Sequence, residues 1–140
     1  MSSSAVHQTL LLWGMRSMQR DGFRVGGIDG FVPQCDYAGK LPRPPNLAGV
    51  RPDAWGVHAG EENVAFVEAK TAGDIDNRHT RLQLRTLGNL RMPVSRKACI
   101  VYVVIPRGAA YALDRVLIDL NLLRAPHIRR LHVPGVLLDH

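Results

Sequence analysis

Three side chains between residues 53 and 70 have types and spacing that suit the binding of a divalent cation. This stretch reads as two strands joined by a short glycine-containing turn. A tight turn at its centre would place Asp53 opposite Glu68. Lys70 lies two residues beyond Glu68 and therefore points to the same face of the hairpin. We expect two carboxylates and one ammonium to converge at one end of this hairpin.

Such a set of groups can hydrolyse a phosphodiester bond. Carboxylates whose Cβ atoms lie about 5 Å apart can hold Mg²⁺ or Mn²⁺, which takes one or two of them together with waters and substrate phosphate. The ammonium adds positive potential toward the phosphate. The alternative is a salt-bridge cluster on an edge hairpin, which stabilises little. Three Glu and three Lys in 140 residues give a chance Glu-x-Lys only about 0.06 times, which favours the catalytic interpretation.

The hydrophobic pattern predicts one α/β domain over residues 1–140, with a mixed sheet of four or five strands and helices on both faces. A type II′ turn on Gly60-Glu61 sets the register of the hairpin. The segment 26–52 is rich in loop signals and is interpreted either as a flap beside the site or as a linker. The predicted helices cover about 5–20, 76–90 and 109–123, and the predicted strands 23–25, 53–58, 63–70, 98–105 and 128–133.

The predicted helix 76–90 carries polar side chains on both of its faces. At about 100° per residue, Gln83 falls on the apolar side with Leu87. A buried amide needs a partner, which is either a metal-bound water or phosphate, or a backbone group. The arginines of this helix form a ridge on its opposite side, interpreted either as solvated or as a phosphate-binding surface. The candidate nucleic-acid-binding residues are Arg51, Arg78, Arg81 and Arg85.

The order Pro52-Asp53, then Glu68-Ala69-Lys70 on the following strand, resembles the PD-(D/E)xK nuclease superfamily over residues 5–105. The short hairpin followed by Gln83 is most similar to the VRR-NUC and Holliday-junction-resolvase branches. The resemblance implies a restriction-endonuclease-like αβββαβ core, extended here by a C-terminal helix and strand.

The resemblance also implies the role of each residue. Asp53, Glu68 and the backbone carbonyl of Ala69 would ligate Mg²⁺ or Mn²⁺, and Lys70 would serve the attacking water. With Gln83 on the next helix, these residues make up the candidate catalytic site.

One departure from the family pattern concerns the first helix. Several branches carry a further Glu there, whereas residues 2–20 contain no acid. Either two carboxylates suffice, or Asp21, Asp29 or Asp36 replaces the third. A zinc site is not expected, because the histidines lack ligand spacing and only two cysteines are present.

The composition favours a polyanionic partner. The chain has 18 basic and 12 acidic residues, a net charge of +6 and a strong excess of Arg over Lys. Arg binds phosphate with a planar fork of donors, although a codon bias would give the same excess. No apolar run is long enough to cross a membrane, residues 1–20 lack the pattern of a signal peptide, and the few cysteines favour a cytoplasmic location.

These observations together predict a divalent-metal-dependent DNA endonuclease, with branched or structured DNA as one candidate substrate. A chain this small would act as a homodimer or with a partner protein. Two alternatives stay open. One is a nucleic-acid-binding module with an idle nuclease-like fold, which the missing helix acid favours. The other is a structural or interaction protein of a mobile element.

Overall fold

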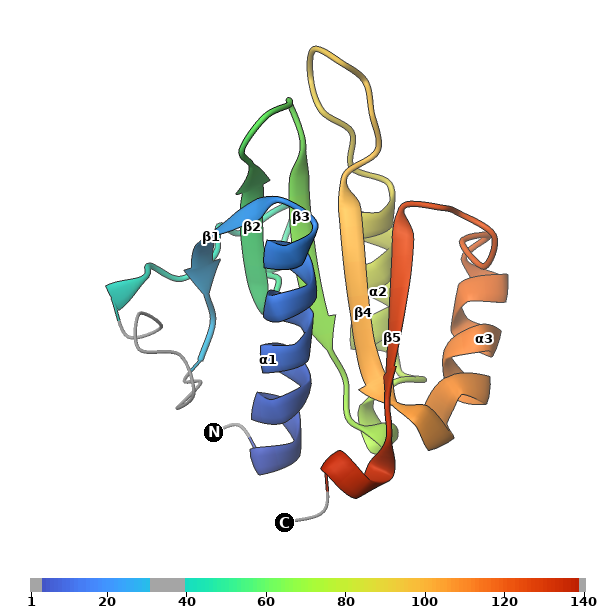
Figure 1. Ribbon diagram of the computed structural model, residues 1–140. Helices are drawn as coiled ribbons and strands as arrows, with labels where there is room; N and C mark the ends of the chain where they lie inside the picture. The colour runs from blue at the N-terminus through green and yellow to red at the C-terminus, as the bar shows by residue number, and fades with distance from the viewer. Residues whose placement is uncertain (1–3, 31–39, 139–140) are drawn as a thin grey trace.

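The computed structural model describes residues 4–30 and 40–138 of the chain. Helices and strands alternate after an initial helix and a three-stranded antiparallel unit (Figure 1). The elements in chain order are α1 (Ala5–Arg20), β1 (Phe23–Ile28), β2 (Ala54–His58), β3 (Val64–Ala69), α2 (Arg78–Gly88), β4 (Ile100–Pro106), α3 (Ala110–Asp119) and β5 (Ile128–Val133).

The five strands form one mixed sheet in the order β1-β2-β3-β4-β5. The first three strands are antiparallel neighbours, whereas β3 pairs parallel with β4 and β4 parallel with β5. The α2 and α3 segments supply the crossovers that parallel neighbours require. The expectation of a mixed α/β sheet of four or five strands is confirmed, and the sheet has five.

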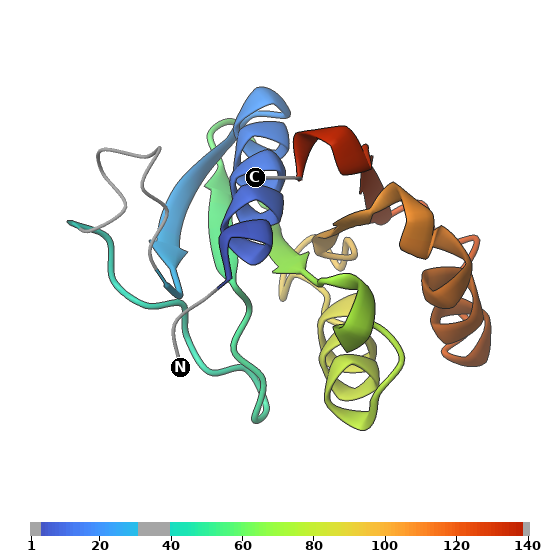
Figure 2. The same cartoon turned by 90° about the horizontal axis from the view of Figure 1, so that it is seen from below.

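Helices cover both faces of the sheet, as expected (Figure 2). On one face α1 packs Leu10, Leu11 and Met15 into a core with the sheet. On the other, α2 and α3 pack into a second core that includes Leu84 and Leu117. The sheet is therefore buried on both sides. A polar side chain on it is either at an end of the sheet or buried.

Helix α1 begins and ends where its sequence predicts. The Ser4 hydroxyl accepts a hydrogen bond from the His7 amide at 3.0 Å and caps the first turn. Gly22 follows the last turn with a φ of 98°, a conformation that glycine adopts without strain. A Cβ atom on Gly14 would lie 2.4 Å from Val67 Cγ1, so the helix lies tight against the sheet. The first turn of α1 is held at one end of the sheet as a result.

The hairpin of β2 and β3 has the predicted register but a different turn. Trp55 pairs with Phe66, as the sequence indicates. The predicted type II′ turn on Gly60-Glu61 is wrong, because that turn needs a positive φ at Gly60 and none is found there. Instead the His58 amide donates to the Asn63 carbonyl at 3.0 Å, and His58 Nδ1 accepts from the amide of Gly60. The wider loop leaves the register unchanged.

The predicted loop 26–52 begins later than its glycines suggest. Strand β1 continues through Ile28, with a register shift between Val25 and Gly27. The Ile28 amide then donates to the Pro42 carbonyl, so the returning chain lies beside the end of β1. Within the described residues this part of the segment contacts the sheet, and residues 31–39 lie outside them.

The two later helices are shorter than predicted. Helix α2 ends at Gly88 rather than Leu90, and α3 ends at Asp119 rather than Leu123. Asn77 caps α2 by accepting from the Thr80 amide at 2.8 Å. None of the helices in the described part of the chain combines the length and apolar character needed to cross a membrane.

Candidate functional site

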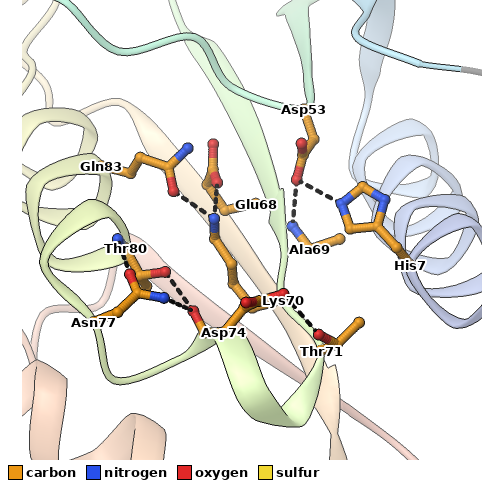
Figure 3. A network of polar contacts seen from close by, with 10 residues as sticks. All are labelled: His7, Asp53, Glu68, Ala69, Lys70, Thr71, Asp74, Asn77, Thr80 and Gln83. Carbon is orange, nitrogen blue, oxygen red and sulfur yellow. Dashed lines mark hydrogen bonds and ion pairs between the residues drawn. The ribbon is translucent and has the colours of Figure 1, made fainter. Parts of the chain in front are cut away.

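The predicted site residues meet where β2 begins and β3 ends. Asp53 directly precedes β2, Glu68 lies within β3, and Lys70 follows its last residue. Helix α2 brings Gln83 from one side and α1 brings His7 from the other (Figure 3). The hairpin register therefore brings together the three side chains that the sequence singled out.

Asp53 is held by groups on two different elements. Its Oδ2 atom accepts a hydrogen bond from the Ala69 amide at 2.8 Å. His7 Nε2 lies 3.4 Å from the same oxygen. The hydrogen bond with Asp53 raises the pKa of His7, although burial opposes the shift. The backbone of Ala69 adds to the rise of the His7 pKa.

Glu68 is the most unusual side chain of the site. It is 0% exposed, and within the described residues neither carboxylate oxygen has a hydrogen-bond partner. Lys70 Nζ lies 3.5 Å from Oε2, within ion-pair range but too far for a strong hydrogen bond. Burial, and then the charge of Asp53, raises the pKa of Glu68 well above its usual value, while Lys70 opposes that rise. A buried carboxylate left in this state costs free energy.

Lys70 and Gln83 form a second layer around Glu68. Lys70 Nζ donates to Gln83 Oε1, and only 12% of the Lys70 side chain is exposed. Gln83 is 5% exposed and faces the sheet, as the helical spacing predicts. Its partner is the lysine ammonium rather than a backbone group. The amide therefore directs the ammonium toward Glu68 and away from solvent.

The residues present fit a divalent cation with few protein ligands. Among residues 4–30 and 40–138, no three His, Cys, Asp or Glu side chains are arranged to enclose an ion. Mg²⁺, however, commonly takes one or two carboxylates and keeps several waters. Within the described residues the two oxygens of Glu68 have no hydrogen-bond donor, which buried carboxylates normally have, and their one cationic neighbour is Lys70 at 3.5 Å. Asp53, Glu68 and the Ala69 carbonyl are the groups that would hold the ion.

A shallow hollow of about 240 Å³ leads to the site from solvent. Ala69 and Lys70 line it from the sheet, and His7 lines it from α1. Its other wall is the start of α2, including Asn77 and His79. In this hollow Lys70 lies beside Asp74 and the first turn of α2, whose amides favour negative charge.

The four candidate DNA-binding arginines are not equally available. Arg81 forms ion pairs with Asp76 and Asp119, each at 2.9 Å. Arg51 donates to the Pro44 carbonyl at 2.8 Å. Arg78 and Arg85 are exposed, and they line a surface hollow of about 460 Å³ with Leu82. The ridge on α2 is therefore basic at its two ends and neutralised at its middle.

None of the acids proposed as a third ligand and described here joins the site. Asp21 lies at the opposite end of α1, where it binds Arg129 at 2.9 Å. Asp29 pairs with Arg43 at 3.3 Å. Asp36 lies outside the described residues. The side chain that reaches Asp53 from α1 is His7, which the sequence analysis missed. A signal was present, since His7 is the first ionisable residue after the Ser4 cap.

Comparisons with family models, with curated proteins and with solved structures gave no significant match for this chain. The assignment of a function therefore depends on the geometry and chemistry of the site.

Proposed function

We propose that the protein is a divalent-metal-dependent deoxyribonuclease that hydrolyses phosphodiester bonds. The observation that supports this most is the Glu68 carboxylate, which is fully buried and without hydrogen-bond partners in the described residues. It lies beside a second carboxylate and an ammonium, a set that nuclease chemistry uses. The PD-(D/E)xK resemblance of the same residues supports the same reaction.

Each group of the chain has a defined task in this proposal. A bound Mg²⁺ or Mn²⁺ would lower the pKa of a coordinated water and offset charge on the phosphoryl oxygens. Glu68 and Asp53 hold the position of that ion, with Asp53 fixed by the Ala69 amide. Lys70 directs its ammonium to the place where negative charge develops in the transition state. Gln83 keeps the ammonium there by accepting its hydrogen bond.

The substrate class follows from the charge of the protein and its exposed arginines. A net charge of +6 attracts a polyanion. Arg78 and Arg85 remain exposed at the surface of α2, the helix that also supplies Gln83. We propose that this surface binds the phosphate backbone of DNA, since phosphate contacts position a nucleic acid without reading its sequence.

The test is a cleavage assay with plasmid, single-stranded, flap and four-way DNA, with RNA as a further substrate. Each is incubated with Mg²⁺, Mn²⁺ or EDTA. We expect cutting of DNA with a metal and none with EDTA. The variants Asp53→Asn and Lys70→Ala should lower the rate by about 100-fold or more, in line with the loss of one group that stabilises a transition state. Lys97→Ala is the matched control, because Lys97 forms a surface ion pair with Glu61 and neither residue belongs to the site.

A second candidate is a DNA-binding module whose metal site is idle. It is favoured by the lack of a three-ligand cluster in the described part of the chain. In that case no substrate is cut with any metal, yet DNA binds with an affinity that falls steeply with salt. If DNA is neither bound nor cut, both candidates are wrong and a structural or interaction protein remains.

A further inference from the structure

We infer that His7 is a positioning residue of the proposed cation site, which holds the Asp53 carboxylate in the orientation that an ion requires. This inference rests on the proposed function and extends it to a residue on a different element. It assigns the first turn of α1 a part in metal binding although that turn carries no acid.

The two oxygens of Asp53 are in different situations. Oδ2 lies against two nitrogen donors, the Ala69 amide at 2.8 Å and His7 Nε2 at 3.4 Å. Within the described residues, the structure gives no hydrogen bond or ion pair to Oδ1. Figure 3 shows the carboxylate held between the end of β3 and the imidazole. One oxygen is thus fixed by the protein, and the other remains for a ligand.

The imidazole is itself held in place by the fold. The His7 amide donates to the Ser4 hydroxyl, which fixes the backbone of the first turn. Its Nδ1 atom is buried and has no hydrogen-bond partner in the described residues. An unpaired buried nitrogen is unfavourable. The favourable polar contact of this imidazole is therefore the one made by its other ring nitrogen, Nε2. The side chain that Nε2 contacts, among those described, is Asp53.

The expected size of the effect follows from how ligand partners behave in known metal sites. A side chain that hydrogen-bonds a metal ligand fixes its orientation, and its removal typically lowers metal affinity by about 10–100-fold. A single amide cannot fix both the position and the rotation of a carboxylate. We therefore expect Asp53 to rotate more freely without His7. This lowers the affinity for the ion without removing a ligand.

The experiment compares three variants by calorimetric titration with Mn²⁺. His7→Leu removes the donor, and His7→Gln retains an N–H that can reach a carboxylate. His79→Leu is the matched control, because His79 lines the same hollow and forms no hydrogen bond or ion pair with residues 4–30 or 40–138. We expect about 10–100-fold weaker binding in His7→Leu, partial rescue in His7→Gln and wild-type affinity in His79→Leu. Circular dichroism and thermal unfolding verify that each variant is folded.

A positioning role also predicts a division of kinetic effects. In the cleavage assay the half-saturating Mn²⁺ concentration of His7→Leu should rise with the dissociation constant. The rate at saturating Mn²⁺ should stay within a few-fold of the wild-type rate, because the groups that meet the substrate are unchanged. A fall of the saturated rate as large as that of Lys70→Ala would overturn the positioning role.

Three further outcomes decide between the alternatives. Equal Mn²⁺ affinity of His7→Leu and wild type contradicts the inference and leaves the proposed nuclease intact. A nitrogen hyperfine coupling in the pulsed electron paramagnetic resonance of bound Mn²⁺, lost in His7→Leu, would make His7 a ligand instead. If the wild-type protein binds no Mn²⁺, the proposed function fails and the inference with it.

Discussion

Two carboxylates beside cations lie toward opposite ends of helix α1, Asp21 directly after its last turn and Glu68 on strand β3 near its first turn, and the fold treats them very differently. Beyond the last turn, Asp21 Oδ2 accepts from the Tyr102 hydroxyl and from Arg129 at 2.9 Å. Near the first turn, Glu68 has Lys70 at 3.5 Å and, within the described residues, no hydrogen-bond donor. Asp21 keeps 37% of its side chain exposed, whereas Glu68 is wholly buried.

The difference separates a structural cluster from a binding site. The Asp21 cluster is complete, because Arg129 also donates to the Tyr102 hydroxyl at 3.2 Å and every group has a partner. Burial, together with Asp21, raises the pKa of Tyr102 to about 12, so this hydroxyl keeps its proton at neutral pH. The Glu68 cluster is incomplete by the same measure, because within the described residues neither Glu68 oxygen has a hydrogen-bond partner. Buried polar groups without hydrogen-bond partners, and groups with perturbed pKa values, are concentrated at functional sites, where a ligand supplies the missing partner.

The largest effect that this comparison predicts is a stabilisation of the protein by a divalent cation. An ion that binds the folded state alone stabilises it by about 2.7 kcal/mol at a concentration 100 times its dissociation constant. We expect thermal unfolding of the wild type to shift upward with Mn²⁺ and to return with EDTA. Glu68→Gln should abolish this increment, and Asp21→Ala should retain it.

An equal response to Mn²⁺ in the wild type and in Glu68→Gln would place the ion elsewhere on the protein. Loss of the response in Asp21→Ala would mean that the two ends of α1 are not independent. Ca²⁺ is a useful third ion in this experiment, since it accepts the same oxygen ligands with less demanding geometry.

The second effect concerns the complete cluster. Asp21→Ala removes the acceptor of the Tyr102 hydroxyl, which is 1% exposed. A buried donor left without a partner lowers the free energy of unfolding by about 1–3 kcal/mol. Urea unfolding measures this change. Glu61→Ala is the control, because the Glu61–Lys97 pair lies at the surface, where an ion pair contributes about 0–1 kcal/mol. DNA cleavage should be the same in both variants, and a loss in Asp21→Ala alone would contradict the division into two clusters.

The sequence predicts the core of the site well because that core is local. Asp53 and Glu68 belong to one hairpin, and the observed loop keeps the register that the expected turn would give. The buried position of Gln83 follows from helical spacing on the next element, α2. Each of these predictions uses a period of two or 3.6 residues within one or two neighbouring elements.

What the sequence could not predict involves contacts between distant elements. His7 reaches Asp53 only because α1 crosses the sheet, which no local pattern encodes. Arg81 is neutralised in part by Asp119, which lies on another helix. The glycines in β1 read as loop, yet a Cβ on Gly27 would lie 2.7 Å from Trp55 Nε1. These glycines are strand residues that make room for an indole ring from the neighbouring strand.

The smallest effect, and the one that tests the comparison most directly, is the pH dependence of the metal-free protein. The pKa of Glu68 is raised in the folded state by burial and by Asp53, so the folded protein holds this proton more tightly than the unfolded chain does. The stability that follows is present below the ordinary carboxyl pKa of about 4.3. It is lost as the pH rises toward the higher folded pKa. Above that value the buried charge is a constant cost.

Glu68→Gln removes this titration and leaves the other ionisable groups in place. The contribution of His7, whose pKa is also raised, is therefore largely common to both proteins and is reduced in their difference. In EDTA at pH 8 we expect the variant to be more stable than the wild type, because it buries no charge at this position. Urea unfolding across the pH range should show the two curves converging toward pH 4. A variant that is less stable than the wild type at pH 8 would show that Glu68 is satisfied in the metal-free fold, as Asp21 is, and the contrast between the two ends of α1 would disappear.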